Sequence, residues 1–449
     1  MQRVLQWFRK LAGDRLGVIV ARGASSALTI NVLSAGALFG ANMVVANVLG
    51  AQSFGDYVYT IGWVNVFTLF TTLGLDTSAI RFVPIYTANA EWSHLRGLVR
   101  RSRLLVLAAG CVAGVVLGGA AWVMVGRIRE TLFSTLLVGC FLLVSLSLLR
   151  LSSAQVQATK RIAQAHFPIY VLRPLMVAAA VAVLYALPAV GVSAPRALAA
   201  NLVATTAALA VSMALLHRAL PPQVHAARPQ PETRRWFGLM VSFLLYSGFL
   251  YLMSRVDILM IGALIGTKNA GLYSVAAQVA SLVVSGLNAV LAIAAPLFSE
   301  LHSNNRRAEL RRVVRLASAG ALAVALVSTA VLILAGPWVL RLFGPEFPRA
   351  YTVLVILCGG MFAFAVMGIG SSLMNMTAHH RQAAWLAALA LVLNVVLNAV
   401  LIPRYGINGA AVATASATVL SNIMVLAYVL RNLELNPTLL PVGFLIRRR

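Results

Sequence analysis

The sequence predicts an all-α integral membrane protein with twelve transmembrane helices in two six-helix lobes. Long apolar stretches, short basic loops and an internal repeat lead to this prediction. Of the 449 residues, 60% are hydrophobic and only 10% are charged, far outside the range of a soluble fold. A bilayer core about 30 Å thick needs roughly 20 apolar residues per helix. Strands of a transmembrane barrel would alternate polar and apolar residues, and the sequence shows no such alternation.

Twelve apolar stretches reach the length of a membrane-spanning helix. We expect spans near residues 28–49, 57–79, 104–126, 131–150, 164–187, 197–217, 237–264, 271–295, 316–340, 350–374, 382–402 and 407–430. No charged residue lies between Arg103 and Arg127, for example, or between Arg404 and Arg431. Uncharged runs of this length are typical of transmembrane helices.

The basic residues of the loops predict the orientation of the helices. When the N-terminus is placed inside, most of the 36 Lys and Arg residues fall in the inner segments. Loops rich in Lys and Arg stay on the cytoplasmic side, so we expect both termini in the cytoplasm. The net charge of +25 then reflects inner loops that face anionic membrane lipids, and we expect no nucleic-acid partner.

The chain divides into five predicted segments. Residues 1–22 mix apolar and basic side chains, which is typical of an interfacial helix on the inner leaflet rather than a cleavable signal. Residues 23–219 would form the first lobe with helices 1–6, and residues 237–431 the second lobe with helices 7–12. A proline-rich cytoplasmic linker at 220–236 would join them, and residues 432–449 would form a cytoplasmic tail.

A repeated turn relates the two lobes. The residues that recur at one constant spacing are Gly50, Gly55 and Tyr57 in the first half and Gly266, Gly271 and Tyr273 in the second. Each half also carries a basic inner loop after its second span. Because each half has an even number of helices, the lobes would be parallel repeats about an axis along the membrane normal.

Several glycine-based motifs follow one another in an informative order. They are Phe54-Gly55-x-Tyr57, Gly74-Leu75 leading to Arg81, Asp257-x-x-x-Ile261-Gly262, Gly271-x-Tyr273 and Pro403-x-Tyr405-Gly406-Ile407. With these motifs nearly the whole chain resembles bacterial polysaccharide (O-antigen type) flippases of the multidrug/oligosaccharidyl-lipid/polysaccharide superfamily.

The resemblance implies a MATE-like fold, in which the two lobes surround a central cavity. It also implies an activity: movement of an undecaprenyl-diphosphate-linked oligosaccharide from the inner to the outer leaflet of the bacterial inner membrane, by alternating access. Partners implied in the same way are a polysaccharide polymerase and a co-polymerase. No cofactor is implied.

Other functions remain as alternatives. Drug exporters of the superfamily usually carry an acidic residue in the first or seventh helix; the first span has none, but Asp257 lies in the seventh. Lipid II exporters are expected to carry a cavity arginine in the first helix, which is absent here. A polysaccharide polymerase or ligase would be an enzyme with a large outer loop, and every predicted outer loop is short. Cys111, Cys140 and Cys358 lie in predicted spans and indicate no metal site.

Two arginines lie within predicted spans and are the candidate cationic residues. Charge in the membrane core is costly and is usually functional, and a diphosphate headgroup needs fixed cations along its path. Arg173 follows His166 and Tyr170 on one helix face, and Arg255 follows Tyr251 by one turn. The alternative is that each arginine reaches the membrane surface or pairs with a neighbouring aspartate.

Amides and carboxylates complete the candidate site. Asn65, Gln278 and Asn288 lie on polar helix stripes and would contact sugar hydroxyls, whereas the serines and threonines of the same stripes favour helix packing. Asp76 and Asp257 could couple transport to an ion. Alternatively, the membrane potential drives transport, Asp76 pairs with Arg81 and Asp257 pairs with a neighbouring helix.

Overall fold

The computed structural model describes most of the chain. The described residues are 15–187, 191–230, 232, 236, 248, 251–252, 255–303, 306–367, 370, 374, 380–432 and 438. Within them the secondary structure is helical apart from turns and a single bridge between Val125 and Ile128. This confirms the all-α prediction.

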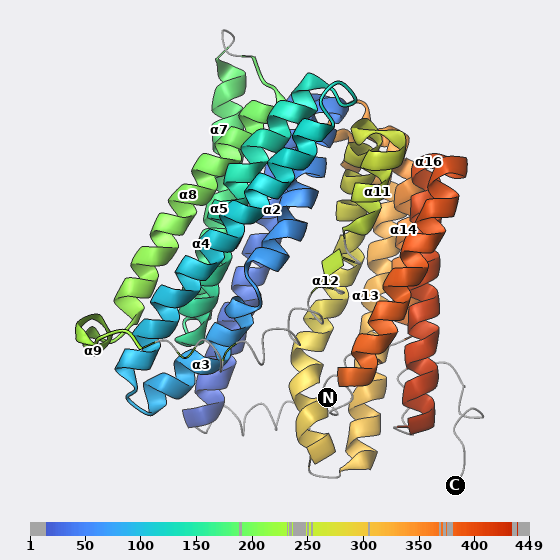
Figure 1. Ribbon diagram of the computed structural model, residues 1–449. Helices are drawn as coiled ribbons and strands as arrows, with labels where there is room; N and C mark the ends of the chain where they lie inside the picture. Colours follow the sequence, from blue (N-terminus) through green and yellow to red (C-terminus); the bar gives the residue numbers. More distant parts are fainter. Residues whose placement is uncertain are drawn as a thin grey trace. The chain divides into compact units, whose positions relative to one another are not determined.

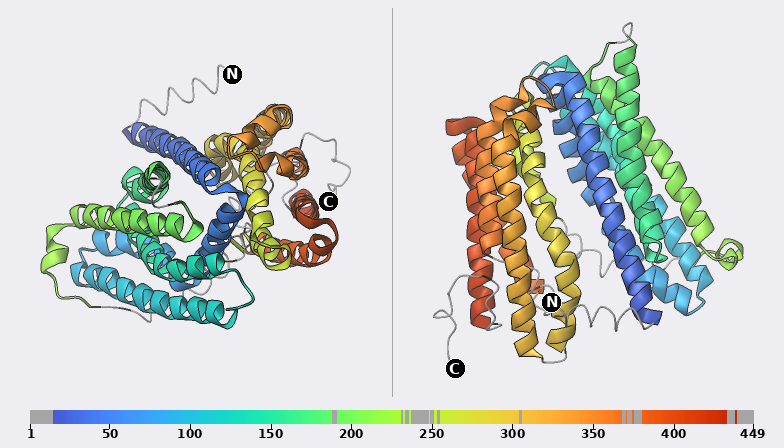
Figure 2. Two further views of the ribbon diagram at one scale, coloured as in Figure 1. Left: turned by 90° about the horizontal axis from the view of Figure 1, so that it is seen from above. Right: turned by 180° about the vertical axis from the view of Figure 1, so that it is seen from behind.

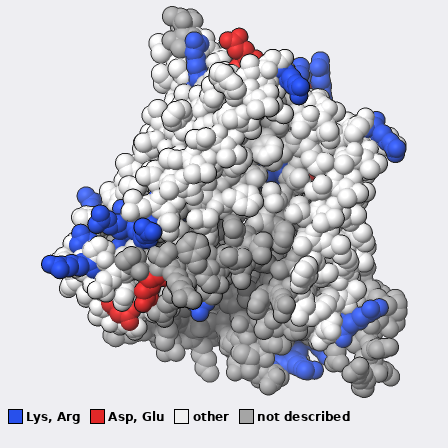
Figure 3. All heavy atoms as spheres, viewed as in Figure 1, with Lys and Arg blue, Asp and Glu red and all other residues white. Residues whose placement is uncertain are grey.

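Nine helices in the described part of the chain are long and apolar enough to cross a membrane, by length and composition. On the face shown in Figure 3, most Lys and Arg side chains lie toward the helix ends, and a broad uncharged surface lies between them. The protein is therefore a multi-pass membrane protein. The count of twelve spans stays a prediction, because much of the predicted span 237–264 and of the region around 368–379 lies outside the described residues.

The chain forms two compact units. The first comprises Met1–Val48 and Val64–Leu244, and the second comprises Leu49–Trp63 and Leu245–Arg449. Residues 49–63 thus pack with the second unit, although they are predicted to belong to the first lobe. The reason is the repeated turn, whose two copies contact each other. The lobe boundaries at 219 and 237 stay a prediction.

The first unit is a bundle around α5. Its helices are the greater part of α2 (Arg15–Thr71), α3 (Leu75–Ala88), α4 (Trp92–Val123), α5 (Glu130–Ala158), α6 (Ile162–His166), the π-helix η1 (Phe167–Leu172), α7 (Arg173–Ala186), α8 (Ala194–Ala219) and α9 (Pro222–Ala226). Helix α5 packs against α8, α4 and α3 (Figure 1). This central position explains why half of the most apolar stretch of α5 is buried.

The predicted linker is attached to the first unit. The buried Trp236 indole donates a hydrogen bond to the Tyr86 hydroxyl at 3.1 Å, and that hydroxyl donates to the Glu232 carboxylate at 2.8 Å. The backbone N–H of Gln230 also donates to the Ser93 carbonyl at 3.0 Å. These bonds hold the described part of the linker against α3 and α4.

The second unit is a bundle around α12. Its helices are α11 (Val256–Ile265), α12 (Thr267–Ser303), α13 (Arg307–Arg341), the 3₁₀ turn η2 (Phe347–Ala350), α14 (Tyr351–Val366) and α16 (His380–Asn432). Helix α12 packs against α13 and α14, and α11 packs against α16 (Figure 2).

Glycines create the sharp turns between consecutive spans. Gly50 interrupts α2 with φ 69° and ψ 169°, and Gly406 interrupts α16 with φ 61° and ψ −140°. Gly266 separates α11 from α12 with φ 93° and ψ 155°. Only glycine adopts these conformations readily. Gly50 and Gly266 are equivalent in the sequence repeat and have similar backbone angles, which confirms the repeated turn.

The second predicted span is shorter than expected. The helix ends at Thr71, and α3 begins at Leu75, although the sequence predicts one helix over 57–79. Leu73 and Gly74 both have positive φ, at 52° and 69°. The left-handed conformation at these two positions ends the helix before Asp76.

Candidate functional site

Asp257 is the centre of a buried polar cluster in the second unit. The residue lies in the first turn of α11 and is only 6% exposed. Its Oδ2 atom accepts hydrogen bonds from the Thr414 hydroxyl at 2.6 Å and from the Tyr273 hydroxyl at 3.0 Å. Its Oδ1 atom accepts a bond from the Asn398 amide at 2.8 Å. Three donors from two other helices therefore fix the carboxylate.

The kink at Gly406 brings both halves of α16 to this carboxylate. Asn394 and Asn398 precede the kink, and Thr414 follows it. Asn398 also donates to the Asn394 carbonyl oxygen at 3.0 Å, and the Asn394 amide donates to the Thr414 hydroxyl at 3.2 Å. Two neighbouring helix segments thus share one hydrogen-bond network.

One buried acceptor of the cluster is unpaired. The Asn398 Oδ1 atom is buried and makes no hydrogen bond within the described part of the chain. The donors to the Asp257 carboxylate (Tyr273, Thr414 and Asn398) are all neutral. A buried carboxylate held by neutral groups is costly unless a proton or a cation joins it. Oxygen atoms of Asp257, Asn398 and Thr414 are the type of ligand that a small hard cation prefers.

In the first unit, Arg150 is a polar residue that the sequence does not single out. It is the last residue of the predicted span 131–150, but α5 continues to Ala158. Arg150 is half-buried, and its guanidinium donates to the Asn65 side-chain oxygen at 2.7 Å. It also interacts electrostatically with Asp76. The arginine predicted to pair with Asp76, Arg81, is exposed.

Arg173 is positioned by the irregular start of the fifth predicted span. The π-helix Phe167–Leu172 leads directly into α7, whose first residue is Arg173. Its Nε atom donates to the buried Asn201 side-chain oxygen at 3.1 Å, which also accepts a bond from Thr205 at 3.2 Å. π-Helical turns occur frequently at functional sites.

The two aromatic candidates differ in exposure. Tyr170 lies in the π-helix, is 48% exposed, and its ring lies edge-on to His166 with centroids 5.3 Å apart. This contact agrees with the helix face that the sequence predicts for the pair. Tyr251 is half-buried in the second unit.

The remaining candidates also lie in the second unit. Arg255 is half-buried directly before α11, and its Nε atom makes no hydrogen bond among the described residues. Gln278 is half-buried and Asn288 is exposed on α12. Asn65, Tyr170 and Arg173 belong to the first unit, so a cavity shared by all these residues stays a prediction.

Small polar residues on the predicted stripes, and others beside them, form hydrogen bonds within and between the helices. The Thr68 hydroxyl bonds to the Val64 carbonyl at 2.7 Å, and the Ser281 hydroxyl bonds to the Gln278 carbonyl at 2.6 Å. The Thr71 and Ser147 hydroxyls lie 2.6 Å apart between α2 and α5. These contacts support the packing interpretation of the serines and threonines.

The fold and these intramembrane polar sites define a class: a polytopic helical protein built on the architecture of membrane transporters. Residues 20–302, more than half of the chain, match the family of polysaccharide biosynthesis proteins. The chain therefore belongs to that family.

A curated relative is the probable low-salt glycan biosynthesis flippase Agl15 of Haloferax volcanii, 28% identical over 176 residues. The match covers 39% of this chain and spans only 37% of the relative's length.

Solved structures show how widely the fold is shared. The lipid II flippase MurJ in an inward closed conformation superposes with a TM-score of 0.70 at 13% identity, covering 92% of this chain and 88% of that one. A multidrug resistance MATE family transporter in an inward-facing conformation superposes with a TM-score of 0.67 at 13% identity, covering 89% and 96%. At this identity the likeness establishes the MATE-like fold and nothing more.

Proposed function

We propose that this protein is a flippase that moves a lipid-linked oligosaccharide from the inner to the outer leaflet by alternating access. Membership in the polysaccharide biosynthesis family, the flippase relative and the MATE-like fold support this proposal. The carrier would be undecaprenyl diphosphate, as the resemblance implies. The protein would act as a transporter rather than an enzyme.

The observation that carries the proposal is the pair of half-buried arginines in the first unit. Arg150 is held by Asn65 and Arg173 by Asn201, each through a hydrogen bond to an amide oxygen. A guanidinium held in this way is preorganised to bind a phosphate or an acidic sugar, because its planar fork loses little freedom on binding. Arg255 would add a third cation from the second unit.

Neutral side chains would contact the sugars. Tyr170 and Tyr251 offer aromatic faces and hydroxyl groups, and Asn65, Gln278 and Asn288 offer amides that can both donate and accept hydrogen bonds. Arg173 with Tyr170, and Arg255 with Tyr251, would then form two halves of a cavity that opens alternately to each side.

Ion coupling is assigned to Asp257 rather than Asp76. Asp76 interacts electrostatically with Arg150, whereas the three hydrogen-bond donors to Asp257 are neutral. Asp257 would bind a proton or a sodium ion and release it during the cycle. Binding would change the charge of a site shared by α11, α12 and both halves of α16, which is a means of coupling an ion to helix movement.

The membrane potential is the competing driving force. Outward movement of a dianion runs with a potential that is negative inside, and each charge contributes about 2.3 kcal/mol at 100 mV. In that case Asp257 would only stabilise the second unit. Reconstituted vesicles separate the two sources of energy, because the potential and the ion gradients can be set independently.

We place the protein in the bacterial inner membrane, as the resemblance implies, with both termini in the cytoplasm on the basis of its basic inner loops. Polysaccharide polymerase and co-polymerase would act on its product at the outer leaflet. These partners rest on the family resemblance alone.

The test of the proposal is transport of a defined substrate. Purified protein in vesicles should move a lipid-linked oligosaccharide to the outer leaflet, where a lectin or a glycosidase detects it. Vesicles with Arg173→Ala should show little movement. If wild-type vesicles leave the oligosaccharide in the inner leaflet under every imposed gradient, the flippase assignment is wrong.

Multidrug or lipid II export is the second candidate, and the acidic Asp257 in α11 is the observation that favours drug export. Dye efflux from cells that express the protein distinguishes it. Efflux that depends on Asp257, together with absent oligosaccharide transport, would replace the flippase assignment.

A further inference from the structure

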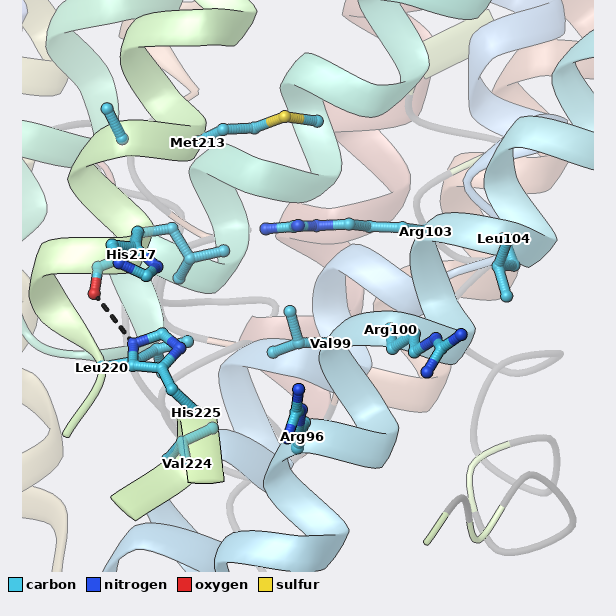
Figure 4. Close-up of a pocket in the computed structure, with 12 residues that line it drawn as sticks. Arg96, Val99, Arg100, Arg103, Leu104, Met213, His217, Leu220, Val224 and His225 are labelled. Atoms are coloured by element: carbon cyan, nitrogen blue, oxygen red, sulfur yellow. Dashed lines mark hydrogen bonds between the residues drawn. The ribbon is translucent and has the colours of Figure 1, made fainter. Parts of the chain in front are cut away.

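A basic pocket lies in the first unit, formed by residues that do not belong to the proposed transport site. It has a volume of about 650 Å³ and lies between the first half of α4, the end of α8 and α9 (Figure 4). Arg96, Arg100 and Arg103 line it from α4, and His217 and His225 line it from α8 and α9. None of its 12 lining residues is acidic.

The side chain of Arg103 extends from α4 across the pocket toward α8, where Met213 and His217 lie (Figure 4). Arg103 is half-buried, and its Nε atom makes no hydrogen bond to any described residue. A buried guanidinium nitrogen without an acceptor costs free energy, which a bound anion would recover. The pocket therefore contains a guanidinium whose Nε atom has no acceptor among the described residues.

The other polar groups support the shape of the pocket. Arg96 donates to the Ala227 carbonyl at 2.6 Å and so ties the segment after α9 to α4. The rings of His217 and His225 lie 4.2 Å apart, and His225 contacts the His217 carbonyl at 3.3 Å. These contacts join α4, α8 and α9 around one space.

Apolar residues form the rest of the wall. Val99, Leu104, Met213 and Leu220 line the pocket, and Leu104 is 51% exposed. Arg103 and Leu104 lie where the predicted span 104–126 begins, and His217 lies where the span 197–217 ends. The pocket is therefore at the level of the lipid headgroups, on the side that the basic loops assign to the cytoplasm.

We propose that this pocket binds the phosphate headgroup of an anionic phospholipid from the cytoplasmic leaflet. Arg103 would bind the phosphate, Arg96 and the two histidines would surround it, and the apolar wall would cover the first part of the acyl chains. Basic pockets between transmembrane helices on this side are suited to such headgroups. The proposal is independent of the transported cargo.

Binding can be measured on the purified full-length protein in neutral detergent. We expect phosphatidylglycerol to remain bound in native mass spectrometry and to raise the thermal midpoint, and phosphatidylcholine to do neither. Arg103→Gln should weaken phosphatidylglycerol binding by roughly tenfold, because it removes a charge-assisted hydrogen bond. Arg101→Gln removes the same charge from an exposed neighbour outside the pocket and should leave binding within about twofold.

Three results would overturn the proposal. The first is wild-type affinity in Arg103→Gln, and the second is equal weakening by Arg103→Gln and Arg101→Gln, which would indicate general surface charge. The third is that inorganic pyrophosphate displaces the bound lipid at the same concentration at which added phosphatidylglycerol displaces it. This result would indicate a site for water-soluble anions.

A measurement on the wild-type protein guards against a variant that fails to fold. A phosphatidylglycerol analogue with a photoreactive group near the phosphate should label the segment 213–225, which lines the pocket from α8 and α9. Labelling confined to other segments would contradict the assignment of the site.

Discussion

Gly55 and Gly271, equivalent residues of the repeat, pack backbone against backbone: a Cβ on Gly271 would lie 2.9 Å from both the Cα and the N atom of Gly55. The surrounding contacts are reciprocal. A Cβ on Gly55 would collide with the Thr267 carbonyl, and one on Gly271 would lie 2.8 Å from the carbonyl oxygen of Ala51, the repeat equivalent of Thr267. The pseudo-two-fold axis of the repeated turn therefore passes between the two glycines.

Substitution at this contact should destabilise the protein. Gly271→Ala places a methyl group against backbone atoms that cannot move aside, and overpacking of this kind costs about 1–3 kcal/mol. We expect a lower thermal midpoint in detergent, measured by the fluorescence of a thiol-reactive dye. Gly359→Ala is the matched control, because no atom lies within 4 Å of a Cβ at that helical position. Equal midpoints for the two variants would show that the contact at Gly271 is not tight.

The basic loops should lie on the cytoplasmic side of the membrane, and cysteine labelling can test this topology. In a background without the three native cysteines, cysteine at Arg127 or Asn408 should react from outside with an impermeant thiol reagent. Cysteine at Asn89 or Gln223 should react only after the cells are opened. All four positions are exposed. Labelling of Asn89→Cys in intact cells would reverse the assignment of the two sides.

Arg173→Ala should reduce transport by about tenfold or more, because the bidentate cation is lost from the membrane core. Asn201 keeps its bond from Thr205, so we expect the variant to fold. Arg173→Lys should retain part of the activity because it retains the charge. Surface polysaccharide in a deletion strain reports the activity, and the exposed Arg311→Ala is the control. Normal polysaccharide with Arg173→Ala would remove this residue from the mechanism.

Arg150 and Asn65 should act as one unit. Either single alanine variant breaks the 2.7 Å hydrogen bond between them, so the double variant should lose little more activity than Arg150→Ala alone. Transport rates in vesicles for the four proteins give the coupling. Purely additive losses would mean that the bond has no part in substrate movement.

Much of the fold could be predicted from the sequence because long uncharged stretches and basic loops are direct consequences of the bilayer. The repeated turn was also visible, since the conformation at Gly50 and Gly266 requires glycine. The break in the helix at Leu73 and Gly74 cannot be predicted, because the hydropathy of residues 57–79 is that of one continuous span. The packing of residues 49–63 depends on contacts more than 200 residues apart, such as the Thr267 hydroxyl with the Asp56 carboxylate at 2.6 Å.

The candidate site was predicted only in part. Asp257 is predicted from the sequence as an intramembrane carboxylate, and the structure adds Asn394 and Asn398 beside it. Thr414 cannot be predicted as part of this cluster, because a single threonine in an apolar helix is ordinarily a packing residue. Arg150 is not a candidate from the sequence, because hydropathy ends the predicted span at residue 150, two turns before Ala158, and helix ends are where such patterns are least informative.

The most direct test of the account is ion-driven transport in vesicles that contain the wild-type protein or Asp257→Asn. The potential is clamped at zero with potassium and valinomycin, and a proton or sodium gradient is then imposed. We predict that one of these gradients drives lipid-linked oligosaccharide to the outer leaflet in the wild type, and that Asp257→Asn abolishes the response while its thermal midpoint stays close to wild type. Transport that follows the potential alone and persists in Asp257→Asn would contradict ion coupling, and no transport under any condition would contradict the flippase itself.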